Sequence, residues 1–150
     1  MPKTRQAAFI LIELMLAVAI LALLGYVAIS NYVDYMERAH VAQAKDDIIA
    51  ISSKLDQYYN GAERYPKSLS ELGLTTIDPW GRPYIYVDLT TRDGHGMARR
   101  DRNLRPLNLD YDLYSIGKDG VTKKPISQTD SLDDVVRAND GRFIDLASKF

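Results

Sequence analysis

The acidic residues near the C-terminus are the side chains best suited to bind a cation. Calcium takes roughly six to eight oxygen ligands, which carboxylates, hydroxyls and backbone carbonyls supply. The spacing is not that of an EF-hand, and no glutamate follows Glu71 to give the usual bidentate ligand. From the residues alone, a solvated acidic loop is therefore favoured over a metal site. The candidate ligands are Asp119, Asp130, Ser131, Asp133, Asp134 and Asp140.

Glu13 is the only charged residue in the apolar segment from Ala7 to Ile29. A helix of this length, about 35 Å, spans a bilayer core of about 30 Å. Lys3 and Arg5 precede it without any acidic residue, a bias that holds the N-terminus in the cytoplasm and sends the remainder across. A secretory signal peptide would have a shorter apolar core, and a plain anchor would leave Glu13 unexplained. A carboxylate inside a membrane costs about 2–3 kcal/mol, so Glu13 predicts a partner.

Catalytic chemistry has no support in the sequence. There is no His-Glu-x-x-His, no Gly-x-Ser-x-Gly, no phosphate-binding glycine loop and no cysteine. His40 and His95 are far apart, the first within a predicted helix and the second in a glycine-flanked loop. We therefore expect that the protein is not an enzyme.

The arginines between Leu89 and Asp110 allow two interpretations. They could contact DNA phosphates or an acidic partner, or they could lie in a solvated loop. No aromatic residue is interleaved among them to stack on bases, so the solvated loop is favoured and no nucleic acid is expected. These residues are Arg92, Arg99, Arg100, Arg102 and Arg105.

The elements that would position these residues can be read from hydrophobic periodicity. Apolar residues recur every three or four positions after residue 40, which predicts that one helix runs from about Phe9 to Tyr59. Pro83 to Asp88 and Tyr111 to Ile116 have the alternation of strands, and Asp78 to Gly81 is typical of a turn. The helical stripe consists of Val41, Ala44, Ile48, Ile51, Leu55 and Tyr58. We expect an α+β fold with a small antiparallel sheet packed on the helix.

The N-terminal motif resembles the signal of type IV pilins and of type II secretion pseudopilins. It comprises the basic leader, residues 1–8, and the sequence Ala-Phe-Ile-Leu-Ile-Glu that ends at Glu13. The resemblance implies that a prepilin peptidase cuts between Ala8 and Phe9 and methylates the new amine. The amine of Phe9 would then pair with Glu13 of a neighbouring subunit, which would fix the axial stagger of a helical filament.

Three further matches follow in the order expected for the major pseudopilin of type II secretion. They are Arg64-Tyr65-Pro66, Asp78-Pro79-Trp80-Gly81-Arg82-Pro83-Tyr84, and the segment from Tyr111 to Gly120. Two regions depart from that family in length. The connection from Tyr65 to Asp78 is shorter than usual, and the stretch from Leu89 to Asp110 is longer. The type IV pilin-like fold is the expected architecture, with a leader at 1–8, a transmembrane and assembly helix at 9–30, and a periplasmic domain at 31–150.

The same resemblance implies one structural Ca²⁺ ion in the loop after the second strand. Its ligands would be the backbone carbonyls of Ile116 and Val121 and the side chains of Asp119, Ser131, Asp133 and Asp134. Asp130 or Asp140 could replace one of the downstream ligands.

The predicted function is that of a structural subunit of a type II secretion pseudopilus, which polymerises through its N-terminal helix and supports protein export. Its partners would be copies of itself, the prepilin peptidase, other pseudopilins and the inner-membrane assembly platform. It would cross the bacterial inner membrane once, with its C-terminal domain in the periplasm. Two alternatives stay open: a type IV pilus subunit for adhesion, motility or DNA uptake, and a monomeric membrane-anchored binding module.

Overall fold

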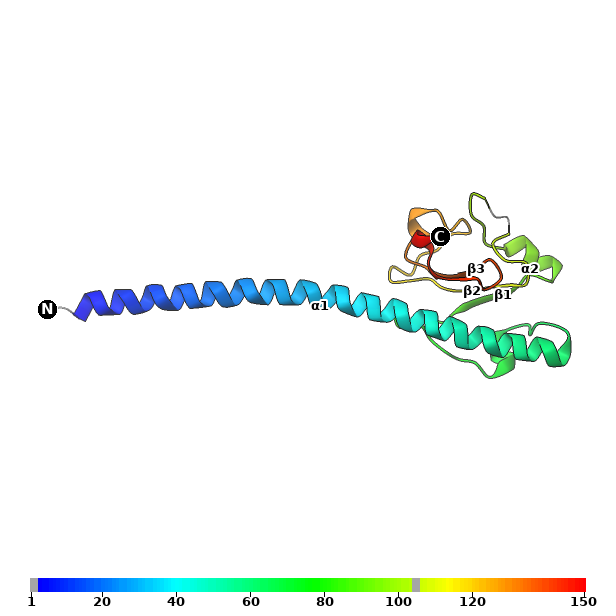
Figure 1. Cartoon of the computed structure of the whole chain (residues 1–150), viewed down its shortest axis with the longest axis horizontal. Coiled ribbons are helices and arrows are strands. Elements are labelled where there is room, and N and C mark those ends of the chain that lie inside the picture. The colour runs from blue at the N-terminus through cyan, green and yellow to red at the C-terminus, as the bar shows by residue number, and fades with distance from the viewer. Residues whose placement is uncertain (1–2, 104–105) are drawn as a thin grey trace. The chain divides into compact units, whose positions relative to one another are not determined.

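The protein consists of one long helix followed by a small four-stranded sheet (Figure 1). The computed structural model describes residues 3–103 and 106–150, and it leaves out the side chains of residues 3–11, 28 and 30. The regular elements are α1 (Lys3–Ala62), β1 (Ile85–Asp88), α2 (Arg92–Met97), β2 (Tyr111–Ser115), β3 (Val135–Ala138) and β4 (Phe143–Leu146). Short 3-10 turns occur at Leu69–Leu72, Thr129–Ser131 and Ala147–Lys149.

The chain divides into two compact units, Met1–Ala39 and His40–Phe150, and α1 contributes to both. Because no proline occurs between Pro2 and Pro66, nothing in the sequence interrupts the helix. Within Ile12–Ala62 the helix contains a window long and apolar enough to cross a membrane, and no part of that window is buried in the protein.

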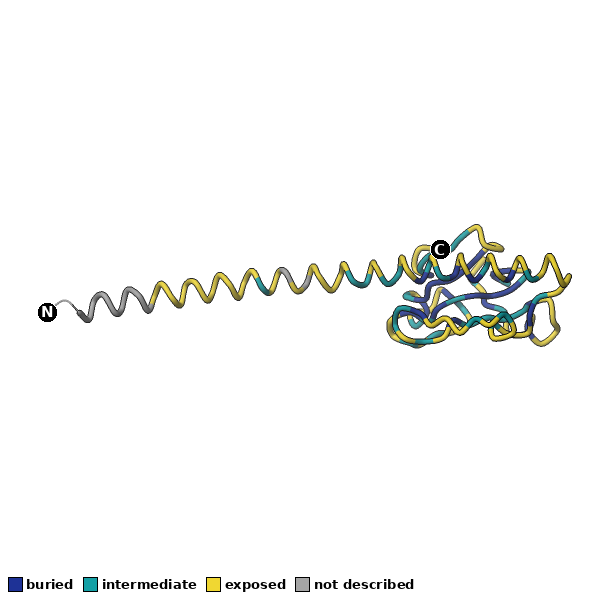
Figure 2. The backbone as a smooth tube through the Cα atoms, turned by 90° about the horizontal axis from the view of Figure 1, so that it is seen from below, coloured by how far each residue is buried: buried dark blue, intermediate teal, exposed yellow. Residues whose placement is uncertain are grey.

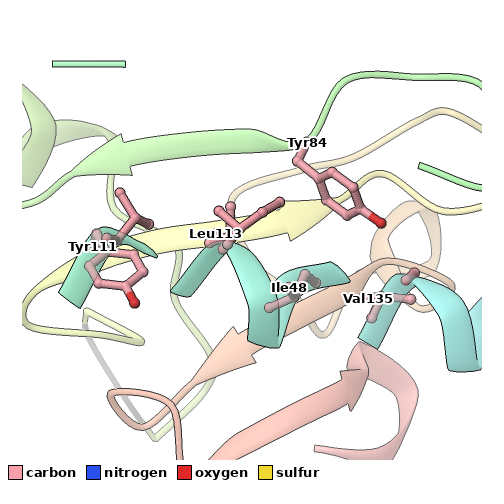
Figure 3. Close-up of a cluster of buried hydrophobic side chains, with 8 residues drawn as sticks. Ile48, Tyr84, Tyr111, Leu113 and Val135 are labelled. Atoms are coloured by element: carbon pink, nitrogen blue, oxygen red, sulfur yellow. The ribbon is translucent and has the colours of Figure 1, made fainter. Parts of the chain in front are cut away.

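In the second unit, the predicted apolar stripe of α1 forms one side of the core. Ile48 and Leu55 are fully buried, and they belong to a cluster with Tyr111 and Leu113 of β2 and Val135 of β3. Figure 3 shows Ile48 beside Leu113 and Val135, and Figure 2 shows the buried residues concentrated in this unit. The predicted helix, the stripe and the α+β class are therefore confirmed.

The sheet is an antiparallel meander in the order β1-β2-β3-β4. Ile85 pairs with Tyr114, Ser115 with Val135, and Ala138 with Phe143. Both predicted strands are present and are shorter than expected. However, the acidic C-terminal stretch, which we expected to have little regular structure, forms β3 and β4. Each strand has only four residues, which is too few for the alternation of apolar and polar residues to stand out.

The segment from Leu89 to Asp110 covers the second face of the sheet. Leu107 is buried with Ile126, Val136 and Ala138 in a second apolar cluster. Side chains alternate between the faces of a strand, so Tyr111 and Leu113 point toward α1 while Asp112 and Tyr114 point toward this segment. The expectation of a solvated loop here is wrong for Arg99, which is buried. Arg92, Arg100 and Arg102 are exposed, and Arg105 lies outside the described residues.

Candidate functional site

The predicted assembly residues lie in the first unit, on α1. Ala8 and Phe9 are helical, but their side chains lie outside the described residues, so cleavage and methylation stay predictions. Glu13 is exposed, and so are the apolar residues on either side of it: Ile12 is 66% exposed and Leu14 is 65% exposed. An isolated chain would hold this surface in water at a large hydrophobic cost, so the helix needs lipid or other helices around it.

Asp78 organises the turn between α1 and the sheet. Its carboxylate is almost completely buried, and its Oδ1 accepts hydrogen bonds from the backbone N–H groups of Trp80, at 3.1 Å, and Arg82, at 2.8 Å. The other oxygen, Oδ2, accepts from the hydroxyl of Ser115 at 2.5 Å. Ser115 ends β2, and its hydroxyl in turn accepts from the N–H of Gly117. One carboxylate therefore fixes the turn to the start of the loop after β2.

The side chain of Arg82 extends from this turn and binds the loop after β2 directly. Its Nη1 donates to the carbonyl of Gly117 at 2.6 Å, and its Nη2 donates to the carbonyl of Lys118 at 3.3 Å. Gly120, with φ at 72°, lies against the guanidinium, and a Cβ at this position would come within 2.7 Å of it. Glycine is required here both for its backbone conformation and for the space that Arg82 fills.

The structure brings Asp119 and Asp133 together, although their carboxylates bond to backbone groups. Oδ2 of Asp133 accepts from the N–H of Asp119 at 3.0 Å, and Oδ1 of Asp119 accepts from the N–H of Val121 at 2.8 Å. Gly117, with φ at 65°, is held so close to Asp133 that a Cβ would overlap the backbone carbonyl of that residue. These contacts close the loop on itself.

Asp134 is bound by an arginine. Its side chain is fully buried, and its Oδ2 forms an ion pair with Nη2 of Arg99 at 2.6 Å and accepts from the hydroxyl of Thr122 at 2.6 Å. The guanidinium of Arg99 stacks over the ring of Tyr114, 4.1 Å from its centroid. Burial raises the pKa of Asp134, and the charge of Arg99 and the hydrogen bond from Thr122 oppose that rise.

The remaining predicted ligands are arranged differently. The hydroxyl of Ser131 is buried and bonds to the backbone of Lys123, accepting from its N–H at 2.8 Å and donating to its carbonyl at 3.1 Å. Asp130 forms an ion pair with the ammonium of Lys123 at 2.7 Å. Asp140 accepts from the N–H of Leu109, away from the loop.

The calcium site stays a prediction, and in this arrangement its predicted side-chain ligands are bound by groups of the protein itself. Over residues 3–103 and 106–150, no three acidic, histidine or cysteine side chains converge closely enough to hold a metal. Asp119, Ser131 and Asp133 each direct an oxygen to a backbone N–H group. Asp134 keeps one buried oxygen, Oδ1, without a partner in the described part of the chain.

Sequence reasoning missed Arg82 and Arg99 as the residues that bind this loop. Arg82 lies inside a matched motif, where its role could not be read without the fold. Arg99 follows α2 by two residues, and the sequence around it gives no signal that separates it from the exposed arginines nearby. A second buried arginine, Arg137, pairs with Asp110 at 2.6 Å and lies over the ring of Tyr111.

Comparison with known proteins agrees with this geometry. Residues 31–130 match the family described as type II secretion system (T2SS), protein G. A type II secretion system core protein G from Dickeya chrysanthemi is 30% identical over 93% of this chain and 90% of its own length. The protein of that name from Pseudomonas aeruginosa is 28% identical over 80% of this chain and 89% of its own length.

A type IV major pilin protein, PilE1 from Neisseria gonorrhoeae, is also 28% identical, over 95% of this chain and 90% of its own length. No solved structure matches the chain at a significant level. The long helix packed on an antiparallel meander, together with these relatives, defines a type IV pilin-like protein. Within that class, the chain belongs to the protein G family of type II secretion systems.

Proposed function

We propose that this chain is a structural subunit of a type II secretion pseudopilus and that it polymerises through the N-terminal part of α1. The observation that carries the proposal is the family match over residues 31–130 in a chain whose apolar helix surface is exposed from Ile12 onward. Self-association through that surface would remove it from lipid or water. The proposed role is mechanical and requires no catalytic centre.

The same proposal covers topology and processing. The chain would be inserted in the inner membrane with its N-terminus in the cytoplasm and its second unit in the periplasm, as the charges of Lys3 and Arg5 favour. A prepilin peptidase would remove residues 1–8. The amine of Phe9 would then be a cation in the apolar phase, and Glu13 of an adjacent subunit would neutralise it. Other pseudopilins and the assembly platform of the inner membrane would be its further partners.

A type IV pilus subunit is the second candidate, because a major pilin matches over nearly the whole chain. The two candidates differ in the process that fails when the chain is removed. In the source bacterium, deletion of this chain should abolish export of type II substrates and leave twitching and DNA uptake intact. The reverse result would assign the chain to a pilus.

Glu13→Ala, returned to the deletion strain, tests polymerisation. The variant should insert in the membrane and keep a folded second unit. It should not restore export, and chemical cross-linking should detect no filaments of this chain. Asp46→Ala is the control, since it removes an exposed carboxylate from the same helix outside the predicted membrane segment. Normal filaments from Glu13→Ala would contradict the pairing of charges.

A further inference from the structure

Two guanidinium groups hold the loop between β2 and β3 from opposite ends. Arg82 binds the carbonyls of Gly117 and Lys118 just after β2, and Arg99 binds Asp134 just before β3. Arg99 also donates to the carbonyl of Lys123, at 3.3 Å, in the middle of the loop. Asp134 is itself one of the predicted metal ligands, and the carbonyls that Arg82 binds lie between the predicted carbonyl ligands Ile116 and Val121.

We propose that Arg82 and Arg99 take the place of a metal ion in this loop, so that the second unit of the protein folds and keeps its stability without calcium.

Arg99 is positioned in advance for this task. Its N–H donates to the buried carboxylate of Asp112 at 2.7 Å, and its carbonyl accepts from the N–H of Leu107 at 2.8 Å. Its guanidinium lies over the ring of Tyr114, 4.1 Å from the centroid, which limits the directions in which it can donate. The backbone and the side chain are thus both held by contacts other than the one with Asp134, which lowers the conformational entropy lost when Asp134 is bound.

The position of Arg99 also disfavours calcium at Asp134. An ion bound to this carboxylate would lie close to a guanidinium that is only 3% exposed, where like charges repel with little screening by water. Asp134 is neutralised by one positive charge, and its Oδ2 is already bonded by Arg99 and Thr122.

Arg99 lies in the segment between Leu89 and Asp110. This segment packs on the second face of the sheet through Leu107. The segment therefore brings the guanidinium of Arg99 to the face of the sheet that carries Tyr114.

Thermal unfolding of the full chain in detergent micelles, in calcium chloride or in chelator, tests the proposal directly. A calcium ion at a hundredfold excess over its dissociation constant would raise the Tm of a domain of this size by about 10 °C. We expect the Tm, followed by near-ultraviolet circular dichroism, to differ by less than about 1 °C between the two conditions. A rise near 10 °C in calcium would overturn the proposal and restore the calcium site.

Variants of Arg99 test whether its guanidinium stabilises the loop. Arg99→Gln leaves the buried Asp134 without its partner and should lower the Tm by at least about 10 °C. Arg100→Gln is the matched control, because this neighbouring side chain is exposed, and its Tm should stay within about 2 °C of the wild type. The double variant Arg99→Gln with Asp134→Asn should recover part of the loss, since neither charge remains.

An Arg99→Gln protein that melts within about 2 °C of the Arg100→Gln control would overturn the role of Arg99. If Arg99→Gln yields no folded protein, the double variant and the wild-type comparison in calcium and chelator still decide the question. None of these measurements involves filaments. A failure of the proposed pseudopilus function would therefore leave the melting results unchanged. A failure of the melting predictions would likewise leave the proposed pseudopilus function unaffected.

Discussion

Replacement of Asp78 by alanine should be among the most damaging single changes in the second unit. Asp78 is 3% exposed, and its carboxylate accepts from the N–H groups of Trp80 and Arg82 and from the hydroxyl of Ser115. The hydroxyl can rotate toward another acceptor, but both N–H groups lose theirs. Each unsatisfied group costs about 1–3 kcal/mol, so we expect Asp78→Ala to lower the free energy of unfolding by about 3–4 kcal/mol.

For a domain of this size, the change corresponds to a fall of about 12–16 °C in Tm. Near-ultraviolet circular dichroism of the full chain in micelles reports it, because the tyrosines of the core lose their fixed environment. Asp78→Asn keeps an acceptor for both N–H groups and should lose roughly half as much. Asp46→Ala, an exposed position on α1, is the control and should change stability by less than about 0.5 kcal/mol. An Asp78→Ala protein as stable as that control would refute the reasoning.

Three further predictions concern processing, insertion and pH. Intact mass of the protein extracted from membranes should show loss of residues 1–8 and one added methyl group; assembled protein that keeps the leader would contradict cleavage. Glu13→Val should insert at least as well as the wild type in a membrane-insertion assay, because it removes a charge from lipid. Burial raises the pKa of Asp145, but Lys45, the N–H of Leu146 and Lys149 lower it more, to about 2. The stability that these contacts give should therefore be present above about pH 4 and lost as the pH falls toward 2, and Asp145→Asn should flatten that part of the denaturation profile.

The helix and its buried face could be predicted because their signals are long. The stripe from Val41 to Tyr58 repeats over several turns, and each of its residues is fully or partly buried. The first two strands could be predicted from the alternation around Ile85 and Val87 and from the tyrosines of β2. β3 and β4 could not, because four-residue strands joined by Asn139 and Gly141 do not differ from loop sequence until their partners are known.

The candidate site was only partly predictable for a different reason. The acidic residues attract attention because their charges are close in sequence, but the cation that binds Asp134 comes from Arg99, 35 positions away. Arg99 and Arg100 are adjacent in the sequence, but the side chain of Arg99 is buried and that of Arg100 is exposed. That difference depends on which face of the sheet the segment covers, and the sequence of the segment alone does not determine it.

The order of the strands has a consequence for how the second unit is made. Because β1, β2, β3 and β4 lie side by side in chain order, each strand can pair with the strand that was made just before it. Such pairings close short loops, whose entropic cost is small and whose formation is fast. The packing of the sheet on α1 closes longer loops: the hydroxyl of Tyr111 on β2 donates to Asp56, 55 positions earlier, and Lys45 on α1 pairs with Asp145 on β4, 100 positions later, at 2.9 Å. The last strand in the chain thus contacts the helix through the longer of these two loops, so this contact can form only when nearly the whole chain is present.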